Sequence, residues 1–302
     1  LYELKGRKSE GGARLVQFIA QAVSRFDQVA IQNICDNLLQ HIEDAFEQPL
    51  TKDILSPPIN DRVQGFFTAL RLVFLTIDSK SLEDPFWPAF VSRILNQYPR
   101  LWQNVRPILS NDKEDLNEDN DRISLTLSWK LVKESASLLQ TILKLSYTMP
   151  QLLKRDDFLT SVDIVIDQLS SVYHRGAFSS VYPTFVDCCE WCFKLSTDSD
   201  LPVTWLESNI SVIELKTQFI SRRSGGLPFL ITGILSASKG KTRKQLMDYA
   251  MVELLRIARL SYVYDADQKM DIPQVHAFNS IQHIFIDTNF ANDCIIYFKD
   301  SL

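Results

Sequence analysis

Apolar residues recur every three or four positions along most of this chain of 302 residues, which is the period of an amphipathic helix. The pattern is strongest over residues 123–147, and Pro150 ends it. The apolar residues that share one face of this segment are Leu125, Trp129, Val132, Ala136, Leu139 and Leu143. The alternation of polar and apolar residues that is typical of strands is essentially absent. The sequence therefore predicts an all-α protein.

The same period predicts helices along the whole chain, joined mostly by short loops. They cover residues 15–26, 34–46, 63–77, 90–95, 123–147, 151–172, 178–195, 202–220, 227–237, 242–260 and 273–286. About a dozen helices of this length fit an α-solenoid of HEAT- or armadillo-like helix pairs better than a four-helix bundle. The count of only nine glycines supports helices over all-β and doubly wound α/β folds, which need more glycine in their turns.

Charge and composition limit the class of protein further. We expect residues 1–302 to be a single helical-repeat region of a longer chain, because the sequence starts with neither a methionine nor a signal peptide. No apolar run approaches the roughly 20 residues that span a membrane. The net charge of −5 excludes a uniformly basic nucleic-acid binder but allows a local basic patch. Five scattered cysteines suggest a reducing, intracellular setting and not a disulfide framework, and we expect a cytoplasmic protein.

Motifs for catalysis or metal binding are missing from the sequence. There is no glycine-rich dinucleotide or phosphate loop and no nucleophile elbow. Only Cys188 or Cys189 can share a helix face with Cys192, so packing in the core is a better interpretation than zinc binding. His276 and His283 are seven residues apart, which is too far for joint metal ligation. The sequence therefore predicts neither an enzyme nor a bound metal.

Residues 110–121 are acidic and almost free of apolar side chains. Such a composition cannot bury enough apolar surface to order itself, and it predicts a solvated loop. Attraction of a basic partner is the functional alternative.

Residues 221–229 read Ser-Arg-Arg-Ser-Gly-Gly-Leu-Pro-Phe and predict the start of a helix. Ser224 is a candidate cap, the two glycines allow a turn, and Pro228 suits the first helical turn. Free N–H groups and two guanidinium groups at such a start suit a phosphate or a carboxylate. The alternative is a tight turn whose arginines pair with acidic residues of a neighbouring helix.

This start lies within the main basic block of the chain. Residues 215–247 hold seven cations and no Asp or Glu; the cations are Lys216, Arg222, Arg223, Lys239, Lys241, Arg243 and Lys244. The last four follow the predicted helix 227–237 in a loop, roughly 15 Å from the arginine pair. Contact with an RNA backbone, a solvated face and favourable placement at a helix C-terminus all remain open. Aromatic residues that would stack on bases are not evident in this block.

Several segments carry a family resemblance in addition. The segments are Trp-x-x-Val-Lys-Glu at 129–134, His-Arg-Gly-Ala-Phe at 174–178, Leu-Pro-x-x-Trp-Leu at 201–206, Arg-Arg-Ser-Gly-Gly-Leu-Pro at 222–228, Pro-Gln-Val-His-Ala-Phe-Asn at 273–279 and Phe-Ile-Asp at 285–287. In this order they resemble the thyroid adenoma-associated protein family, which includes the fungal partner subunit of the tRNA anticodon-loop ribose 2′-O-methyltransferase. All of them lie within residues 123–302. Gly225 stands where the family usually has Ala, and Phe278 where it usually has Leu.

The resemblance implies a non-catalytic regulatory subunit. Family members bind a small tRNA 2′-O-methyltransferase, which carries the S-adenosylmethionine site, and direct it to the first nucleotide of the tRNA anticodon loop. The subunit itself needs no cofactor. Carried over to this chain, the tRNA- or partner-binding motif consists of Arg222, Arg223, Ser224, Gly225, Gly226, Leu227 and Pro228.

The resemblance also suggests roles for individual residues. Arg222 and Arg223 would contact phosphates of the anticodon stem-loop region or an acidic surface of the enzyme, while Leu227 and Pro228 fix the turn. His276 and Asn279 lie one helical turn apart and would hydrogen-bond the backbone of this turn. The residues expected to join them from a neighbouring helix are His174, Arg175 and Gly176.

A second interpretation is a general protein-binding helical scaffold that never contacts RNA. The inner surface of a solenoid serves either role. The two differ in salt dependence, because RNA affinity falls by about one unit of log–log slope for each phosphate contacted.

Overall fold

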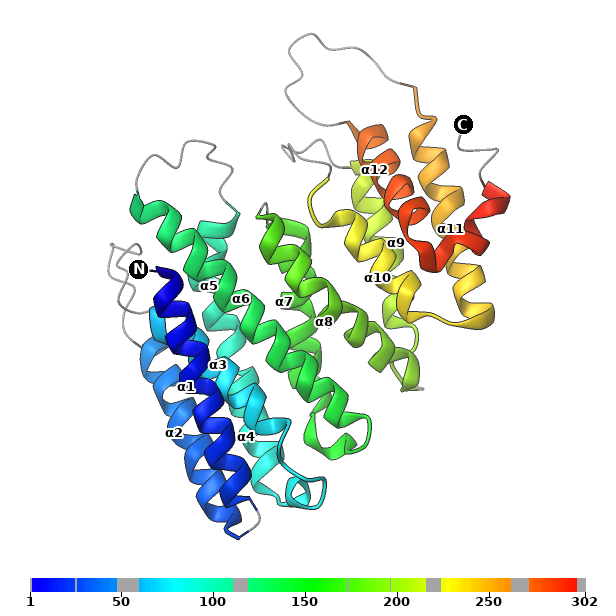
Figure 1. The fold of residues 1–302 in the computed structure, drawn as a ribbon. Coiled ribbons are helices and arrows are strands. Elements are labelled where there is room, and N and C mark those ends of the chain that lie inside the picture. Colours follow the sequence, from blue (N-terminus) through cyan, green and yellow to red (C-terminus); the bar gives the residue numbers. More distant parts are fainter. Residues whose placement is uncertain are drawn as a thin grey trace. The chain divides into compact units, whose positions relative to one another are not determined.

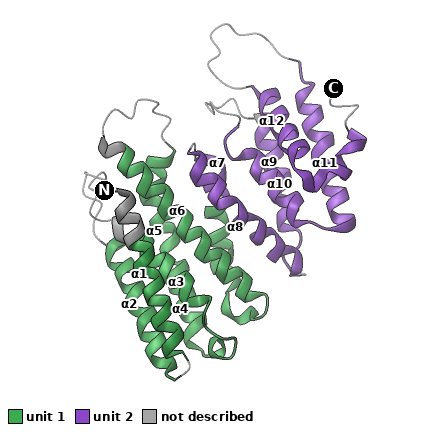
Figure 2. Cartoon of the chain, in the orientation of Figure 1, with its two compact units in different colours: residues 1–165 green, residues 166–302 purple. Residues whose placement is uncertain are grey.

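The computed structural model describes residues 2–24, 26–47, 60–110, 119–172, 174–195, 197–215, 224–261 and 272–297 (Figure 1). Within these ranges the chain is built from α-helices and short 3-10 helices, with no strand. The predicted all-α class is confirmed. The chain divides into two compact units, residues 1–165 and 166–302 (Figure 2). Each unit has its own core and is described by itself.

The first unit packs its helices in two layers. One layer consists of α1 (Tyr2–Val23), α3 (Asn60–Phe74) and α6 (Asp119–Ser146); the other consists of α2 (Gln28–Glu47), α4 (Phe86–Leu95) and α5 (Gln97–Leu109). The short 3-10 helices Ser81–Glu83 and Pro150–Leu152 lie in this unit, and α7 (Arg155–Ser171) crosses the boundary between the units. Phe67, Phe74, Phe90 and Tyr98 fill the core between the layers.

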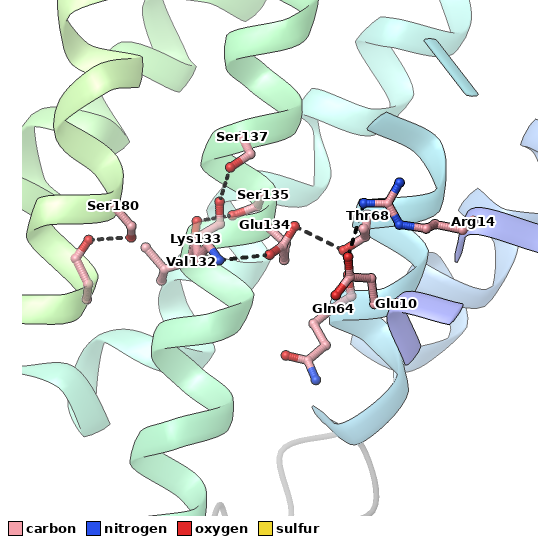
Figure 3. A network of polar contacts seen from close by, with 11 residues as sticks. Glu10, Arg14, Gln64, Thr68, Val132, Lys133, Glu134, Ser135, Ser137 and Ser180 are labelled. Atoms are coloured by element: carbon pink, nitrogen blue, oxygen red, sulfur yellow. Dashed lines mark hydrogen bonds and ion pairs between the residues drawn. The ribbon is translucent and has the colours of Figure 1, made fainter. Parts of the chain in front are cut away.

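Close approach and polar contacts join the helices of the first layer. A Cβ atom on Gly65 of α3 would lie 2.2 Å from the hydroxyl oxygen of Ser9 in α1, so glycine lets these two helices approach closely. The hydroxyl of Thr68 donates to the carboxylate of Glu134 in α6 over 3.0 Å. Figure 3 shows this bond together with the ion pair between Lys133 and Glu134. Such contacts set the register of α3 against α6.

Helix α5 is absent from the sequence-based prediction, because Pro99 follows the predicted helix 90–95 and suggests its end. Pro99 instead lies in the first turn of α5, where a missing N–H has no helical partner to lose. Pro107 lies inside the last turns. The buried side chains Tyr98, Leu101, Trp102, Val105 and Leu109 follow the helical period. The apolar spacing of α5 is regular, but its two prolines kept it from being predicted from the sequence.

The second unit repeats the two-layer arrangement. One layer consists of α8 (Arg175–Lys194), α10 (Leu227–Ala237) and α12 (Pro273–Ile286), and the other of α9 (Leu201–Leu215) and α11 (Gly240–Ala258). The segments Thr288–Phe290, Ala291–Cys294 and Ile295–Tyr297 complete it. Helix α10 contacts α8, α9, α11 and α12, and most of its residues are buried. A short helix that is apolar on all sides is stable only in such a central position.

The predicted bounds 227–237 and 273–286 agree with α10 and α12. Layers of neighbouring helices are consistent with the predicted α-solenoid, while the HEAT or armadillo type and the single repeat region over 1–302 stay predictions. The acidic run 110–121 falls mainly outside the described residues; α6 begins at Asp119, four residues before the predicted start at 123. None of the helices in the described ranges combines the length and apolar character needed to cross a membrane.

Candidate binding site around the Ser224 turn

The turn that leads into α10 has an unusual backbone. Ser224 and Gly225 both lie in the left-handed region, with φ of 65° and 56°. Gly225 adopts this conformation freely, whereas a serine is disfavoured there. The residue that precedes the helix is Gly226, without a side-chain cap, so the prediction that Ser224 caps α10 is wrong. The predicted place of Pro228 in the first turn is confirmed.

Ser224 is buried and contacts α12. The side chain is 1% exposed. Its hydroxyl oxygen lies 2.7 Å from Nδ1 of His276 and accepts a 3.0 Å hydrogen bond from the side-chain amide of Asn279. The hydroxyl can donate its own proton to His276 while it accepts from Asn279. His276 and Asn279 thus contact this turn as predicted, although these bonds go to the serine hydroxyl and not to the backbone.

Gly226 lets the turn pack closely against the backbone of α7. A Cβ atom at this position would lie 2.0 Å from the backbone carbonyl oxygen of Leu169 in α7. Its φ of −86° is open to any residue, so the requirement for glycine comes from space alone. The carbonyl of Ser224 accepts from the N–H of Leu227, and that of Gly226 from the N–H of Leu230. The turn is therefore fixed between α7 and α12.

Three of the predicted site residues, Lys216, Arg222 and Arg223, lie outside the described residues. The structure describes the residues that flank them: Leu215, which ends α9 and precedes Lys216, and the buried Ser224, which follows Arg223. Their contact with phosphate or with an acidic surface stays a prediction.

The predicted supporting residues His174, Arg175 and Gly176 form the start of α8. His174 precedes the helix and its Nδ1 accepts a 3.2 Å hydrogen bond from the N–H of Ala177. Burial lowers the pKa of His174, which keeps the ring neutral and able to accept this bond. Arg175 is exposed. Helix capping is therefore a role that the structure gives to His174; a role of these three residues in supporting the Ser224 turn stays a prediction.

The sequence predicted a loop for the cluster of Lys239, Lys241, Arg243 and Lys244. The structure instead places this cluster at the start of α11. Lys239 precedes α11, and Lys241, Arg243 and Lys244 lie in its first turns. The prediction failed because Gly240, with φ of 56°, lets the chain turn directly into the helix. Lys239, Lys241 and Lys244 are exposed.

Arg243 closes the end of α10. Its guanidinium donates to the carbonyl of Ser238 over 2.9 Å and to that of Ser236 over 3.0 Å. The same group lies 5.8 Å from the centre of the Phe290 ring. These carbonyls lack partners inside the helix, so Arg243 satisfies the C-terminus of α10. Of the cations predicted for a supporting basic patch, Arg243 thus has a structural role.

An aromatic cluster that the sequence did not reveal lies next to the Ser224 turn. The ring of Phe229 lies 5.1 Å from Tyr182, 5.3 Å from Phe178 and 4.5 Å from His283, centre to centre. Tyr182, Phe229 and His283 are half-buried, and Phe178 is buried. The members come from α8, α10 and α12 and are up to about a hundred positions apart in sequence. No short sequence pattern therefore predicts that their rings meet.

Burial against Phe229 lowers the pKa of His283, while the charge of Asp287 opposes this effect. The unfolded chain then binds a proton at a higher pH than the folded chain, so the free energy of unfolding falls as the pH drops below about 6.5. We expect His283→Phe to reduce this loss, by at most about 1.4 kcal/mol per pH unit. Denaturant unfolding of both proteins between pH 7.5 and 5.5 measures the difference, and equal pH profiles would contradict it.

The cysteines are part of the cores. Cys188, Cys189 and Cys192 are buried in α8, and burial raises the pKa of Cys188 and Cys189 well above the ordinary value. Thiols of this kind are unreactive and behave as small apolar groups. In the part of the chain that the structure describes, no three His, Cys, Asp or Glu side chains are grouped as metal ligands.

Comparison with known proteins places most of the chain in one group. A family model with the description "THADA/TRM732, DUF2428" matches residues 89–302. The chain is 28% identical to the "tRNA (32-2'-O)-methyltransferase regulator trm732" of Schizosaccharomyces pombe, over 100% of this chain and 21% of that protein.

Animal proteins match a shorter part. The "tRNA (32-2'-O)-methyltransferase regulator THADA" of Mus musculus is 32% identical over 57% of this chain, and that of Homo sapiens 31% identical over 58%. Each alignment covers 9% of the animal protein. The chain therefore spans about a fifth of the length of the fission yeast relative and about a tenth of the animal ones.

Proposed function

Since the chain belongs to the THADA/TRM732 family, as its sequence motifs predicted, we propose that it is part of a non-catalytic regulatory subunit of a tRNA 2′-O-ribose methyltransferase. In this proposal the subunit acts in the cytoplasm. It binds the catalytic subunit, which carries S-adenosylmethionine, and positions tRNA for methylation of the first nucleotide of the anticodon loop. The names of the fission yeast and animal relatives, regulators of a tRNA methyltransferase, support this role.

The observation that carries the site assignment is the buried network of Ser224, His276 and Asn279. It ties the turn after the two arginines to α12, while Gly226 seats the same turn against α7. Because this turn is fixed on both sides, the residue that follows Arg223 is held in place. We expect this to lower the entropy lost when the two arginines engage a partner. Guanidinium groups at such a place suit the phosphates of a tRNA backbone.

We expect removal of both arginines to impair methylation without dissociating the protein complex. The test uses the full-length protein that contains this chain, its methyltransferase partner and unmodified tRNA. The Arg222→Ala/Arg223→Ala variant should lower methylation about tenfold or more. Its tRNA affinity should show a log–log salt slope shallower by about two, one for each phosphate that the arginines no longer bind. Complex formation between the two proteins is measured in parallel.

A matched control removes the same charge elsewhere. Arg100 and Arg122 are exposed and lie outside the motif, so Arg100→Ala/Arg122→Ala should leave methylation near wild type. Unchanged methylation in the Arg222→Ala/Arg223→Ala variant would overturn the site assignment. A wild-type tRNA affinity that does not respond to salt would instead favour the general protein-binding scaffold.

A further inference from the structure

We propose that Tyr182, Phe229 and His283 form a stacking surface for an unpaired nucleobase of the bound tRNA. This proposal rests on the proposed function and adds a direct base contact to it. RNA-binding proteins recognise unpaired bases by stacking them on aromatic or histidine rings and by hydrogen-bonding their edges. We refer to these three residues as the aromatic strip.

The aromatic strip crosses one layer of the second unit. Tyr182 comes from α8, Phe229 from α10 and His283 from α12, three helices that pack side by side (Figure 1). Phe229 lies in the middle, at 5.1 Å from the Tyr182 ring and 4.5 Å from the His283 ring. The rings of Tyr182 and His283 thus adjoin Phe229 on either side, tilted against it by 72° and 56°.

The aromatic strip is supported by a neighbouring ring and is only half-buried. Phe178 lies against Phe229 at 5.3 Å and is 8% exposed, so it supports the strip from inside. The three residues of the strip are each half-buried, so none of them is sealed inside the core. Rings held on rigid helices lose little conformational entropy when a ligand stacks on them.

Polar groups lie at the edge of the strip. The Nδ1 atom of His283 lies 3.5 Å from the hydroxyl of Thr232. The hydroxyl of Tyr182 lies 3.3 Å from that of Ser236. A base that stacks on the strip would therefore meet hydrogen-bonding groups at its edge, which is the combination used to hold splayed bases.

Charge favours a nucleic acid over a protein as the partner of this surface. Phe229 lies inside the sequence run 215–247, which holds seven cations and no acidic residue, and the acidic group whose charge acts on the strip at His283 is Asp287. Arg175 is exposed and shares a helix face with Phe178 and Tyr182, at spacings of three and seven residues. Along α12, His283 lies on the same face as His276 and Asn279, one to two turns beyond the Ser224 contacts.

The test compares two phenylalanines of the same cluster. Phe229→Leu keeps an apolar side chain but removes the half-buried ring at the centre of the strip, whereas Phe178→Leu removes a buried ring next to it. Binding of the full-length protein, with its methyltransferase partner, is measured to an anticodon stem-loop RNA that carries 2-aminopurine at unpaired positions. We expect Phe229→Leu to weaken binding about tenfold and to abolish the stacking-dependent fluorescence quench. The salt slope should stay unchanged, because every phosphate stays bound.

Phe178→Leu should keep both the RNA affinity and the quench. Equal losses in the two variants would show that the effect comes from disturbed packing and would overturn the proposal. An unchanged RNA affinity in Phe229→Leu would also overturn it, and a weaker methyltransferase interaction in that variant would assign the strip to the protein partner. The proposed function fails separately, through normal methylation in the Arg222→Ala/Arg223→Ala variant.

Discussion

Gly226→Ala is expected to lower the free energy of unfolding by about 3 kcal/mol or more. The new Cβ atom would lie 2.0 Å from the carbonyl oxygen of Leu169 and 2.9 Å from its carbonyl carbon. Because the obstacle is the backbone of α7 and not a flexible side chain, either α7 or the start of α10 must move. Overpacking of this kind typically costs about 1 to 3 kcal/mol, and more when the neighbours cannot yield. Denaturant unfolding measures the loss, which corresponds to roughly 10 °C in melting temperature.

Gly240→Ala is the matched control for this prediction. Gly240 has a φ of 56°, but nothing lies within 4 Å of the Cβ atom it would gain. Its replacement should cost only the strain of a left-handed alanine, about 1 kcal/mol. If Gly226→Ala were as stable as Gly240→Ala, the seating of the turn against α7 would be refuted.

Ser224→Ala is expected to cost about 2 to 3 kcal/mol and to reduce methylation together with stability. The substitution removes a hydroxyl that contacts both His276 and Asn279 in a site that is 1% exposed. Buried polar groups that lose a hydrogen-bond partner cost roughly 1 to 3 kcal/mol each. The arginine pair would then emerge from a turn that is no longer tied to α12. Unfolding and methylation assays on the same variant measure both effects.

Ser224→Gly separates the hydrogen bonds from the backbone strain. Both variants lose the hydroxyl, but glycine relieves the φ of 65°, which costs a residue with a side chain about 1 to 2 kcal/mol. We therefore expect Ser224→Gly to be more stable than Ser224→Ala, while methylation is impaired in both. A glycine variant that is less stable than the alanine variant would show that the left-handed turn carries no strain.

If both stability predictions hold, the turn before α10 owes its shape to two contacts of different kinds. One is a steric fit of Gly226 on α7, and the other is a polar anchor from Ser224 to α12. Neither contact uses the arginines themselves. That division is consistent with the proposal that Arg222 and Arg223 bind a partner while neighbouring residues shape the turn.

The sequence alone was sufficient to predict the class of the fold and the place of most helices. Helix formation depends on contacts three or four residues apart, so the apolar period and the prolines located α10 and α12 with their bounds. It failed at α5, where Pro99 and Pro107 fit a first turn and a last turn instead of ending a helix. The linear motif at 222–228 also pointed to the family and to the position of the candidate site.

Only the tertiary structure decided what the residues of the site do. Serine is a residue type typical of helix caps, yet the side chain of Ser224 bonds to His276 and Asn279, which are 52 and 55 positions away. Arg243 belongs to a basic cluster in the sequence, yet it binds the carbonyls that end α10. The aromatic strip needs three helices to meet. Local propensity is set within a few residues of the chain, whereas these contacts exist only after packing has brought distant helices together.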